Sequence, residues 1–497
     1  MLFVSALVIP ILGFFLQSYP RFFNKYFGVD VWTRLLEIDQ VKKAHHKIPG
    51  RITKGFIIDG FFDYPPVFPF IFSFFPKDFL LKKQGFIAPF FDAIQNVVVF
   101  FIAMQITHNP AVAFLSQAIY GLTPIISIEN SYLTPRSLGY LLFTLSFYPL
   151  LVFHTTHQPQ LLFVSIFFTI LLFLTHRFAL QAFLFTAVFF AIYDKSAMYI
   201  FVPIIGFLGA ILVTKGYYLR VAKGHLSNIY FWVINYQDRF SHQIYGRKNK
   251  QKSDWVGKIY GLLSTFSPVF LFGLNIWLFS GFVYFYLIYF TNFSIIKTPV
   301  LVSMSVWILS LYVLAAIVLK VKWLIPIGEG QRYLEMCTVP SSILSAVLFF
   351  FFYNRFGIIV VFVLSLMLIE NLLLIITIQI KGIIKDKNRS LTQNIIEAYS
   401  YINKLSGTPR IMCIPHQITT MTVYHTKADI LVNADNPGLL KLSDFFPVVK
   451  KPIEEIIKKY SLDYILLREN FAKLSDLHIK NPKVVFRADD ILLLKVG

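Results

Sequence analysis

Two acidic side chains near the start of the chain could do chemistry at a membrane surface. Asp30 follows the first apolar run, and Asp63 comes later, directly before Tyr64 and two prolines. A carboxylate at the boundary between lipid and water can act as a general base toward a substrate whose tail lies in the bilayer. An acid in that position can also be merely solvated, and the two prolines would form a rigid turn without any further role.

Further polar residues stand in short breaks between later apolar runs. Glu129 lies in a predicted loop that ends in a Thr-Pro pair, which suits the start of a helix, and Arg136 follows. An arginine near the membrane is energetically costly unless it pairs with an acid or a phosphate. For Arg136 the sequence is compatible with either partner. His176 and Arg177 interrupt another apolar region, where they are either solvated or available to a phosphate.

The segment 328–335 contains an arginine between two acids. Arg332 and Tyr333 lie between Glu329 and Glu335, shortly before Pro340. A local salt bridge explains this pattern. The alternative is a clamp on a phosphate, for which the planar guanidinium group is better suited than an ammonium group.

The elements that must position these residues are membrane helices. The chain has 497 residues, of which 56% are hydrophobic and 55 are Phe. Runs of roughly 17–25 apolar residues fit a bilayer core, and the first run lacks the basic start and cleavage site of a signal peptide. We expect an all-α polytopic membrane domain over 1–384 with about 12 spans, near 1–17, 88–107, 110–127, 137–153, 159–174, 177–192, 197–214, 260–280, 281–296, 299–320, 338–353 and 357–380.

Charge and cysteine content narrow the class of protein further. The net charge of +20 fits basic cytoplasmic loops and anionic headgroups better than nucleic acid, since no basic module stands apart from the spans. The loop 215–258 has nine Lys and Arg against two Asp, which favours the cytoplasm, although the parity of the predicted spans favours the other side. With only Cys337 and Cys413, we expect neither a disulfide nor a metal-thiolate site.

From residue 385 the composition becomes that of a soluble domain. Alternating patterns predict a small α/β domain over 385–497, with strands at 410–415, 428–432 and 462–467, a helix at 453–460 and a hairpin at 484–496. His416 and Asp435 in this domain are interpreted as structural or surface residues rather than catalytic ones.

The long loop 18–87 carries a recognisable pattern. Gly-Val-Asp-Val-Trp-x-x-Leu at 28–35 precedes a helix-like stretch with Lys42, Lys43, His45 and His46, and the Tyr-Pro-Pro turn follows. This pattern resembles the first external loop of the GT-C class of membrane glycosyltransferases, which use polyprenyl-phosphate donors. The Arg-Tyr-Leu segment before Pro340 is similar to a separate segment of several families of that class. The Trp-Trp-Asp type of signature of oligosaccharyltransferases is absent, which disfavours glycosylation of Asn-x-Ser/Thr peptides.

The resemblance implies roles for the polar residues above. Asp30 would be the general base toward the acceptor or would orient it, and Glu129 would be a second catalytic acid or a ligand of a divalent cation, Mg or Mn. The lipid phosphate and substrate would be held by a larger set, namely Arg332, Tyr333, Arg136, Arg177, His176, Asp63 and Tyr64.

The resulting hypothesis is an inverting enzyme in the cell membrane. It would move a hexose or pentose from a polyprenyl-phosphate donor to a glycan, lipid or protein acceptor, with the C-terminal domain outside the cytoplasm. One alternative is a transporter or flippase of lipid-linked saccharides, which predicts charged residues within spans and internal repeats. The other is a non-catalytic assembly subunit on the same fold.

Overall fold

The computed structural model describes residues 2–52, 54–129, 132–239, 241–246, 268–293, 295–480 and 482–497. The chain forms two compact units, each assembled from three segments. The helical unit comprises Met1–Lys25, Gly85–Tyr218 and Ser253–Lys385, and the α/β unit comprises Tyr26–Gln84, Leu219–Lys252 and Asp386–Gly497. Part of the predicted basic loop, 247–258, lies outside the described residues.

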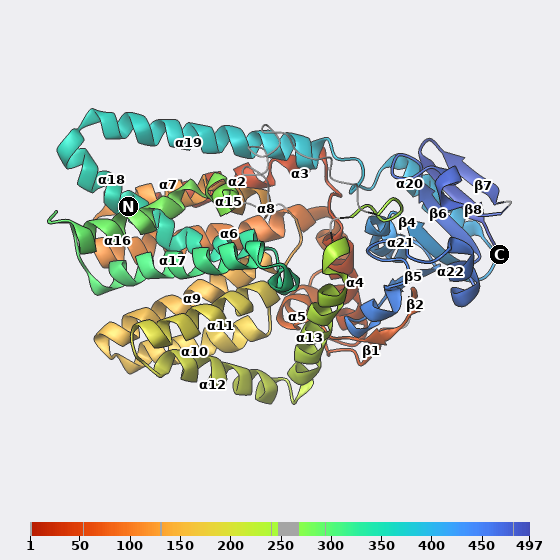
Figure 1. The fold of residues 1–497 in the computed structure, drawn as a ribbon, viewed down its shortest axis with the longest axis horizontal. Helices are drawn as coiled ribbons and strands as arrows, with labels where there is room; N and C mark the ends of the chain where they lie inside the picture. Colours follow the sequence, from red (N-terminus) through yellow and green to blue (C-terminus); the bar gives the residue numbers. More distant parts are fainter. Residues whose placement is uncertain are drawn as a thin grey trace. The chain divides into compact units, whose positions relative to one another are not determined.

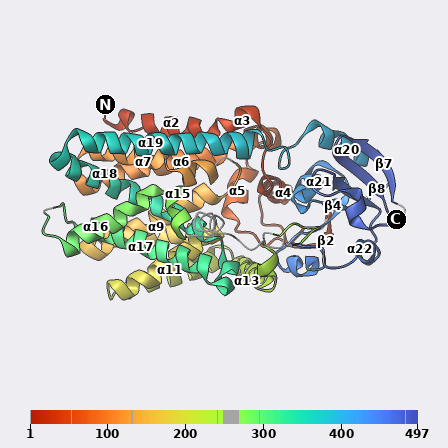
Figure 2. The ribbon, with the colours of Figure 1, turned by 45° about the horizontal axis from the view of Figure 1, so that its top comes forward.

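Apolar helices build the helical unit. Helices α9, α10 and α11 run beside one another (Figure 1), and α18 contacts both α17 and α19 (Figures 1 and 2). The helices of this unit are α1 (Leu2–Ser5), α2 (Val8–Ser18), α3 (Pro20–Phe23), α6 (Lys77–Thr107), α7 (Pro110–Gly121), α8 (Pro124–Glu129), α9 (Arg136–Thr156), α10 (Pro159–Phe173), α11 (Arg177–Tyr193), α12 (Met198–Val213), α15 (Pro268–Leu274), η2 (Ile276–Leu278), α16 (Phe279–Phe290), α17 (Pro299–Lys320), η3 (Lys322–Ile327), η4 (Gly330–Cys337), α18 (Thr338–Phe356), α19 (Ile358–Gln379) and η5 (Ile380–Ile384).

The chain is a multi-pass membrane protein, but the predicted number of about 12 spans is not confirmed. Among the described residues, five helices are long and apolar enough to cross a membrane, or six if one bent pair counts as a span. Three further apolar helices are shorter, namely Pro159–Phe173, Arg177–Tyr193 and Ile276–Phe290. The predicted run 110–127 is in fact two helices, because α7 ends at Gly121 and Pro124 starts α8.

A mixed sheet forms the framework of the α/β unit. Its strand order is β2-β5-β4-β6-β8-β7. The strands β2 (Phe56–Ile58), β5 (Asp429–Asn433), β4 (Arg410–Ile414) and β6 (Tyr464–Arg468) are parallel, whereas β8 (Ile491–Lys495) pairs antiparallel with β6 and with β7 (Lys483–Ala488). The predicted strands, the final hairpin and the helix at 453–460 are therefore confirmed.

One strand of this sheet comes from a distant part of the sequence. β2 belongs to the predicted external loop 18–87, yet it pairs in parallel with β5, with Phe56 opposite Ile430 and Ile58 opposite Asn433. The other elements of the unit are β1 (Arg51–Ile52), β3 (Gly60–Phe61), α4 (Asp30–Lys43), α5 (Val67–Ser73), α13 (Tyr217–Asn235), η1 (Tyr236–Asp238), α20 (Gln393–Lys404), η6 (His416–Ile418), α21 (Thr419–His425), η7 (Pro437–Leu442), α22 (Ile453–Tyr460) and η8 (Leu474–Leu477).

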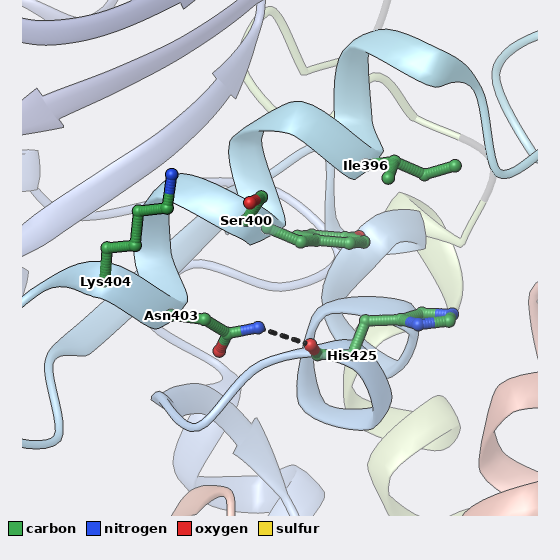
Figure 3. Close-up of a pocket in the computed structure, with 6 residues that line it drawn as sticks. Ile396, Ser400, Asn403, Lys404 and His425 are labelled. Carbon is green, nitrogen blue, oxygen red and sulfur yellow. Dashed lines mark hydrogen bonds between the residues drawn. The ribbon is translucent and has the colours of Figure 1, made fainter.

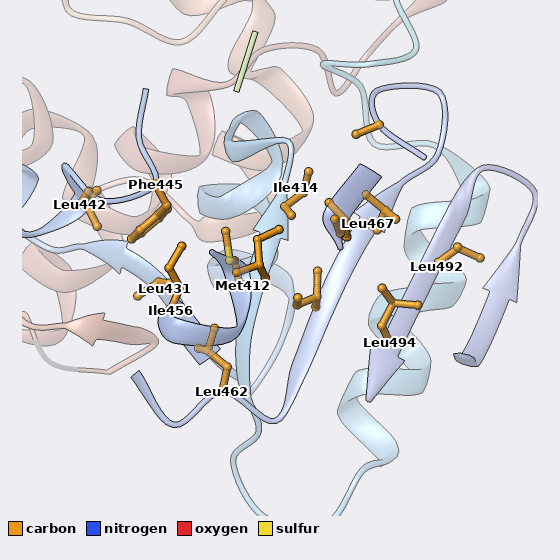
Figure 4. Packing of buried hydrophobic residues seen from close by; sticks show 14 of the residues in the cluster. Met412, Ile414, Leu431, Leu442, Phe445, Ile456, Leu462, Leu467, Leu492 and Leu494 are labelled. Carbon is orange, nitrogen blue, oxygen red and sulfur yellow. The ribbon is translucent and has the colours of Figure 1, made fainter. Parts of the chain in front are cut away.

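Alternate residues of the central strands form the core of the α/β unit (Figure 4). Because successive side chains of a strand point to opposite faces, every second residue enters the same layer. The strand residues in this layer are Met412, Ile414, Ile465, Leu467, Leu492 and Leu494, and Leu442, Phe445 and Ile456 pack against them.

The junction of β2 with the C-terminal segment predicts a sharp difference between two glycines. A Cβ atom on Gly60 would lie 2.3 Å from Cγ of Asp435, whose carboxylate accepts from the backbone N–H groups of Phe61 and Gly438. A Cβ atom on Gly50 would meet nothing within 4 Å. We expect Gly60→Ala to destabilise the unit by about 1–3 kcal/mol.

Gly50→Ala is the matched control and should stay within about 0.5 kcal/mol of the parent. Both effects are measurable as hydrogen exchange of β2 and β5 in the full-length protein in detergent. Equal protection of these strands in the two variants would contradict the close packing of Gly60 on Asp435.

Candidate active site

Asp30 is the first residue of α4 and its side chain is exposed. An acid in the first turn is favourable because the helix N-terminus carries partial positive charge. Buried apolar residues anchor the helix, namely Val31, Trp32, Leu35, Ile38 and Val41. Trp32 packs on α21, with its ring 4.7 Å from the ring of His425. The exposed acid thus starts a firmly held helix.

A largely buried ion pair lies further along α4. Arg34 contacts Glu37 at 2.5 Å, and its guanidinium group lies 3.5 Å from the ring centroid of Tyr64. Burial raises the pKa of Glu37 to about 7, while Arg34 acts in the opposite direction. Tyr64 was predicted to bind substrate. In the structure its ring packs against the guanidinium group of Arg34.

Asp63 joins the first loop to the C-terminal segment. Its carboxylate accepts from the backbone N–H of Asn436 at 2.9 Å and from the side-chain amide of Asn436 at 3.1 Å. Burial raises the pKa of Asp63 to about 6, although these hydrogen bonds oppose the shift. On the other side Gly224 leaves room for it, since a Cβ there would lie 2.3 Å from its oxygen.

Glu37 and Asp63 line the same small cavity of about 60 Å³. Its other polar lining residues are Thr33, Gln40, Tyr64, Thr420 and Asn433. Sequence analysis did not single out Glu37. Its spacing from Asp30 could have pointed to it, because residues seven apart lie on the same side of a helix.

Residues from the start of α11 and from η4 meet around one aromatic ring in the helical unit. The guanidinium groups of Arg177 and Arg332 lie 5.2 Å and 5.1 Å from the ring centroid of Phe178. The ring of Tyr333 is 6.4 Å from the same ring, and the ring of His176 is 6.0 Å from it. We call these five residues the Phe178 cluster. Four of the predicted substrate-binding residues are therefore brought together.

Two of the arginines in this region are paired with acids. Arg332 contacts Glu329 at 2.9 Å, and its side chain keeps 26% of its exposure. Arg136 lies 3.9 Å from Glu335, and both of these side chains are buried. Of the two partners that the sequence left open for Arg136, the structure supplies the acid.

His176 and Tyr333 support the cluster from within. His176 caps α11, because its Nδ1 accepts from the backbone N–H of Ala179 at 3.4 Å. The hydroxyl of Tyr333 donates to Oε1 of Gln181 at 3.1 Å, and the ring is buried. His176 thus stabilises the start of α11, and Tyr333 ties η4 to α11.

The candidate metal ligand stands at the end of α8. Glu129 is its last residue, and residues 130 and 131 lie outside the described part of the chain. Among the described residues, no group of three His, Cys, Asp or Glu side chains lies close enough to hold a metal ion.

His416 and Asp435 both make structural contacts. The ring of His416 lies 4.2 Å from that of Phe446, and burial lowers the pKa of His416 to about 4. Asp435 accepts backbone hydrogen bonds at the junction with β3.

A larger groove of about 460 Å³ lies between α20 and α21 (Figure 3). Its lining residues are Ile396, Tyr399, Ser400, Asn403, Lys404 and His425, and Asn403 donates to the backbone oxygen of His425. Burial, with a smaller contribution from Lys77, lowers the pKa of His425 to about 4. None of the lining residues is an acid, so this groove does not contain any of the predicted carboxylates.

Comparisons with known proteins give matches in structure only. No protein-family model matches the chain, and no curated protein matches its sequence. The oligosaccharyltransferase of Archaeoglobus fulgidus, in its apo form, superposes with a TM-score of 0.57 at 10% identity, over 96% of this chain and 70% of that one.

Two ligand-bound structures are also similar. The A. fulgidus oligosaccharyltransferase AglB, in complex with an inhibitory peptide and a dolichol-phosphate, has a TM-score of 0.57 at 11% identity, covering 96% of this chain and 70% of that one. ArnT from Cupriavidus metallidurans bound to undecaprenyl phosphate has a TM-score of 0.53 at 11% identity, covering 99% and 98%. At such identities the likeness establishes the fold, and the chain has the fold of the GT-C class of membrane glycosyltransferases.

Proposed function

We propose that the protein transfers a sugar from a polyprenyl-phosphate donor to an extracytoplasmic acceptor, with inversion at the anomeric carbon. The observation that carries this proposal is the Phe178 cluster, in which Arg177 and Arg332 approach one ring, on a fold shared with proteins solved with polyprenyl phosphates. The sugar is a hexose or a pentose, and the acceptor is a glycan, lipid or protein.

The cations of the cluster serve the donor end of the reaction. A leaving polyprenyl phosphate gains negative charge as its bond to the sugar breaks, and positioned guanidinium groups stabilise that charge. Arg332 is the principal candidate because its side chain is partly exposed. Arg136 is almost wholly buried against Glu335 and would act as a more distant charge.

Asp30 serves the acceptor end. Its carboxylate takes the proton of the acceptor hydroxyl or amide while the acceptor atom forms a bond to the anomeric carbon. The bond from that carbon to the phosphate oxygen breaks, and the electron pair leaves with the polyprenyl phosphate. A single displacement of this kind inverts the configuration.

The proposal includes a divalent cation, Mg or Mn, only as an ion that Glu129 would bind. One similar structure, that of the A. fulgidus oligosaccharyltransferase, is a complex with Zn and sulfate. We further propose that the protein resides in the cell membrane and that residues 385–497 form an extracytoplasmic domain.

One buried acid within a candidate span favours the transporter hypothesis. Asp92 lies within α6, a candidate span, and is buried. Its carboxylate is engaged, however, because it accepts from the hydroxyl of Tyr120 at 2.6 Å and from the amide of Gln17. These bonds account for Asp92 as a helix-packing residue, and the transferase remains the better proposal.

The role of Asp30 predicts a loss of activity without a loss of folding. We expect Asp30→Asn to lower kcat by about 10²–10⁴-fold, because the amide cannot accept the proton. The assay follows label moving from a radiolabelled polyprenyl-phosphate sugar to acceptor in membranes that contain the full chain. Asp39→Asn, on the same helix but in an ion pair with Lys43, is the control and should retain activity. Full transfer by Asp30→Asn would reject Asp30 as the base.

The role of Arg332 predicts weaker handling of the phosphate. We expect Arg332→Gln to lower kcat/KM for the donor by about 10²-fold, and to weaken binding of undecaprenyl phosphate to the purified protein. Arg355→Gln is the control, because that guanidinium group also lies over an aromatic ring, 3.8 Å from Phe351, but outside the cluster. Unchanged binding and unchanged kcat/KM in Arg332→Gln would contradict the phosphate role.

A further inference from the structure

We propose that Arg468, in the C-terminal sheet, is a positioning residue for Asp30 and acts through the segment 386–391. This inference rests on the proposed function of Asp30 as the base. All of the contacts that carry it lie within the α/β unit. We call the segment 386–391 the strap.

The strap pairs with the residues that lead into α4. Phe27 and Ser390 form an antiparallel bridge, the N–H of Gly28 donates to the carbonyl of Arg389 at 2.9 Å, and the N–H of Leu391 donates to Tyr26 at 3.3 Å. The guanidinium group of Arg389 also lies 4.8 Å from the ring centroid of Phe27. The backbone two residues before Asp30 is therefore fixed by the strap.

Gly28 makes this pairing available. Its φ of 120° is a conformation that residues with a side chain rarely adopt, so the chain can turn from the strap directly into the first turn of α4. The next residue is held from another side, because the hydroxyl of Thr420 donates to the carbonyl of Val29 at 3.3 Å. Asp30 follows these two tethered peptides.

Arg468 holds the strap from the sheet. It is the last residue of β6, only 1% exposed, and its Nη1 donates to the carbonyls of Lys387 at 3.1 Å and Asn388 at 2.8 Å. Its Nε lies 3.6 Å from Asp490, which offsets the charge. Because this buried guanidinium group donates to two backbone carbonyls, it fixes the path of the strap backbone.

The strap has its own internal brace. Asp386 accepts from the backbone N–H groups of Asn388 and Arg389, and from Nε of Arg389 at 2.7 Å. The segment is thus a rigid connection, and a displacement at Arg468 is passed to Arg389 and then to Gly28. A general base needs its position defined closely, since an error of about 1 Å can cost about 10²-fold in rate.

The test uses the full-length protein with Arg468→Met, which keeps an unbranched side chain and removes the donors. We expect faster hydrogen exchange of the peptide that contains Gly28 and Asp30, and a fall in kcat of about 10–100-fold with an unchanged KM for the donor. Arg487→Ala is the matched control, because that arginine pairs with Glu469 on the same sheet but its side chain is 58% exposed and does not reach the strap. It should leave both exchange and kcat unchanged.

A double substitution separates positioning from a general structural defect. Asp30→Glu moves the carboxylate by one methylene and already loses the alignment, so adding Arg468→Met should cost clearly less than it does in the parent. Fully additive losses would overturn the proposal, as would exchange at Gly28 that is unaffected by Arg468→Met. Activity retained by Asp30→Asn would instead reject the proposed function, while the exchange result would still report on the strap.

A second variant covers the case in which Arg468→Met does not fold. Thr420→Val removes only the hydroxyl that holds Val29, and we expect a smaller fall in kcat with an unchanged donor KM. If Thr420→Val changes neither kcat nor the exchange of the peptide that contains Asp30, the tethering of this peptide is not what positions the base.

Discussion

The parallel pairing of β2 with β5 is the interaction on which the α/β unit depends. It joins a strand from near the start of the chain to one from near its end. Because this pairing fixes the loop that carries α4, the side chains of the two regions can form shared hydrogen bonds, such as those from Asn436 to Asp63. A sheet edge that would otherwise expose unpaired backbone groups is covered at the same time.

Burial of charge is the second constraint, and it is met in the same way in both units. An ionised side chain removed from water must be paired or hydrogen-bonded. Arg34 with Glu37, and Arg136 with Glu335, follow this rule. The exposed Asp30 does not need such a partner, because its carboxylate stays hydrated.

Local patterns predicted much of this architecture, and long-range pairing was what they missed. The helix at 453–460 was predicted with its observed limits, and the strands of the C-terminal region followed from alternation. No local signal marks Phe56–Ile58 as part of the same sheet, because its partner lies more than 370 residues away. The grouping of His176, Arg177, Arg332 and Tyr333 was expected from resemblance, but the ring that gathers them, Phe178, is one of 55 phenylalanines and carries no distinguishing pattern. Glu37 was missed for a related reason, since an acid on a polar helix looks solvated until its burial is known.

The arginines of the helical unit differ in what a phosphate would have to displace. Arg136 is closed in against Glu335, so a ligand that took its place would leave a buried carboxylate without its countercharge, at a cost of several kcal/mol. Arg332 keeps a quarter of its exposure beside Glu329, and the loss of a partly exposed ion pair costs about 1 kcal/mol or less. In the proposed reaction, engaging Arg332 would therefore cost a phosphate less than engaging Arg136.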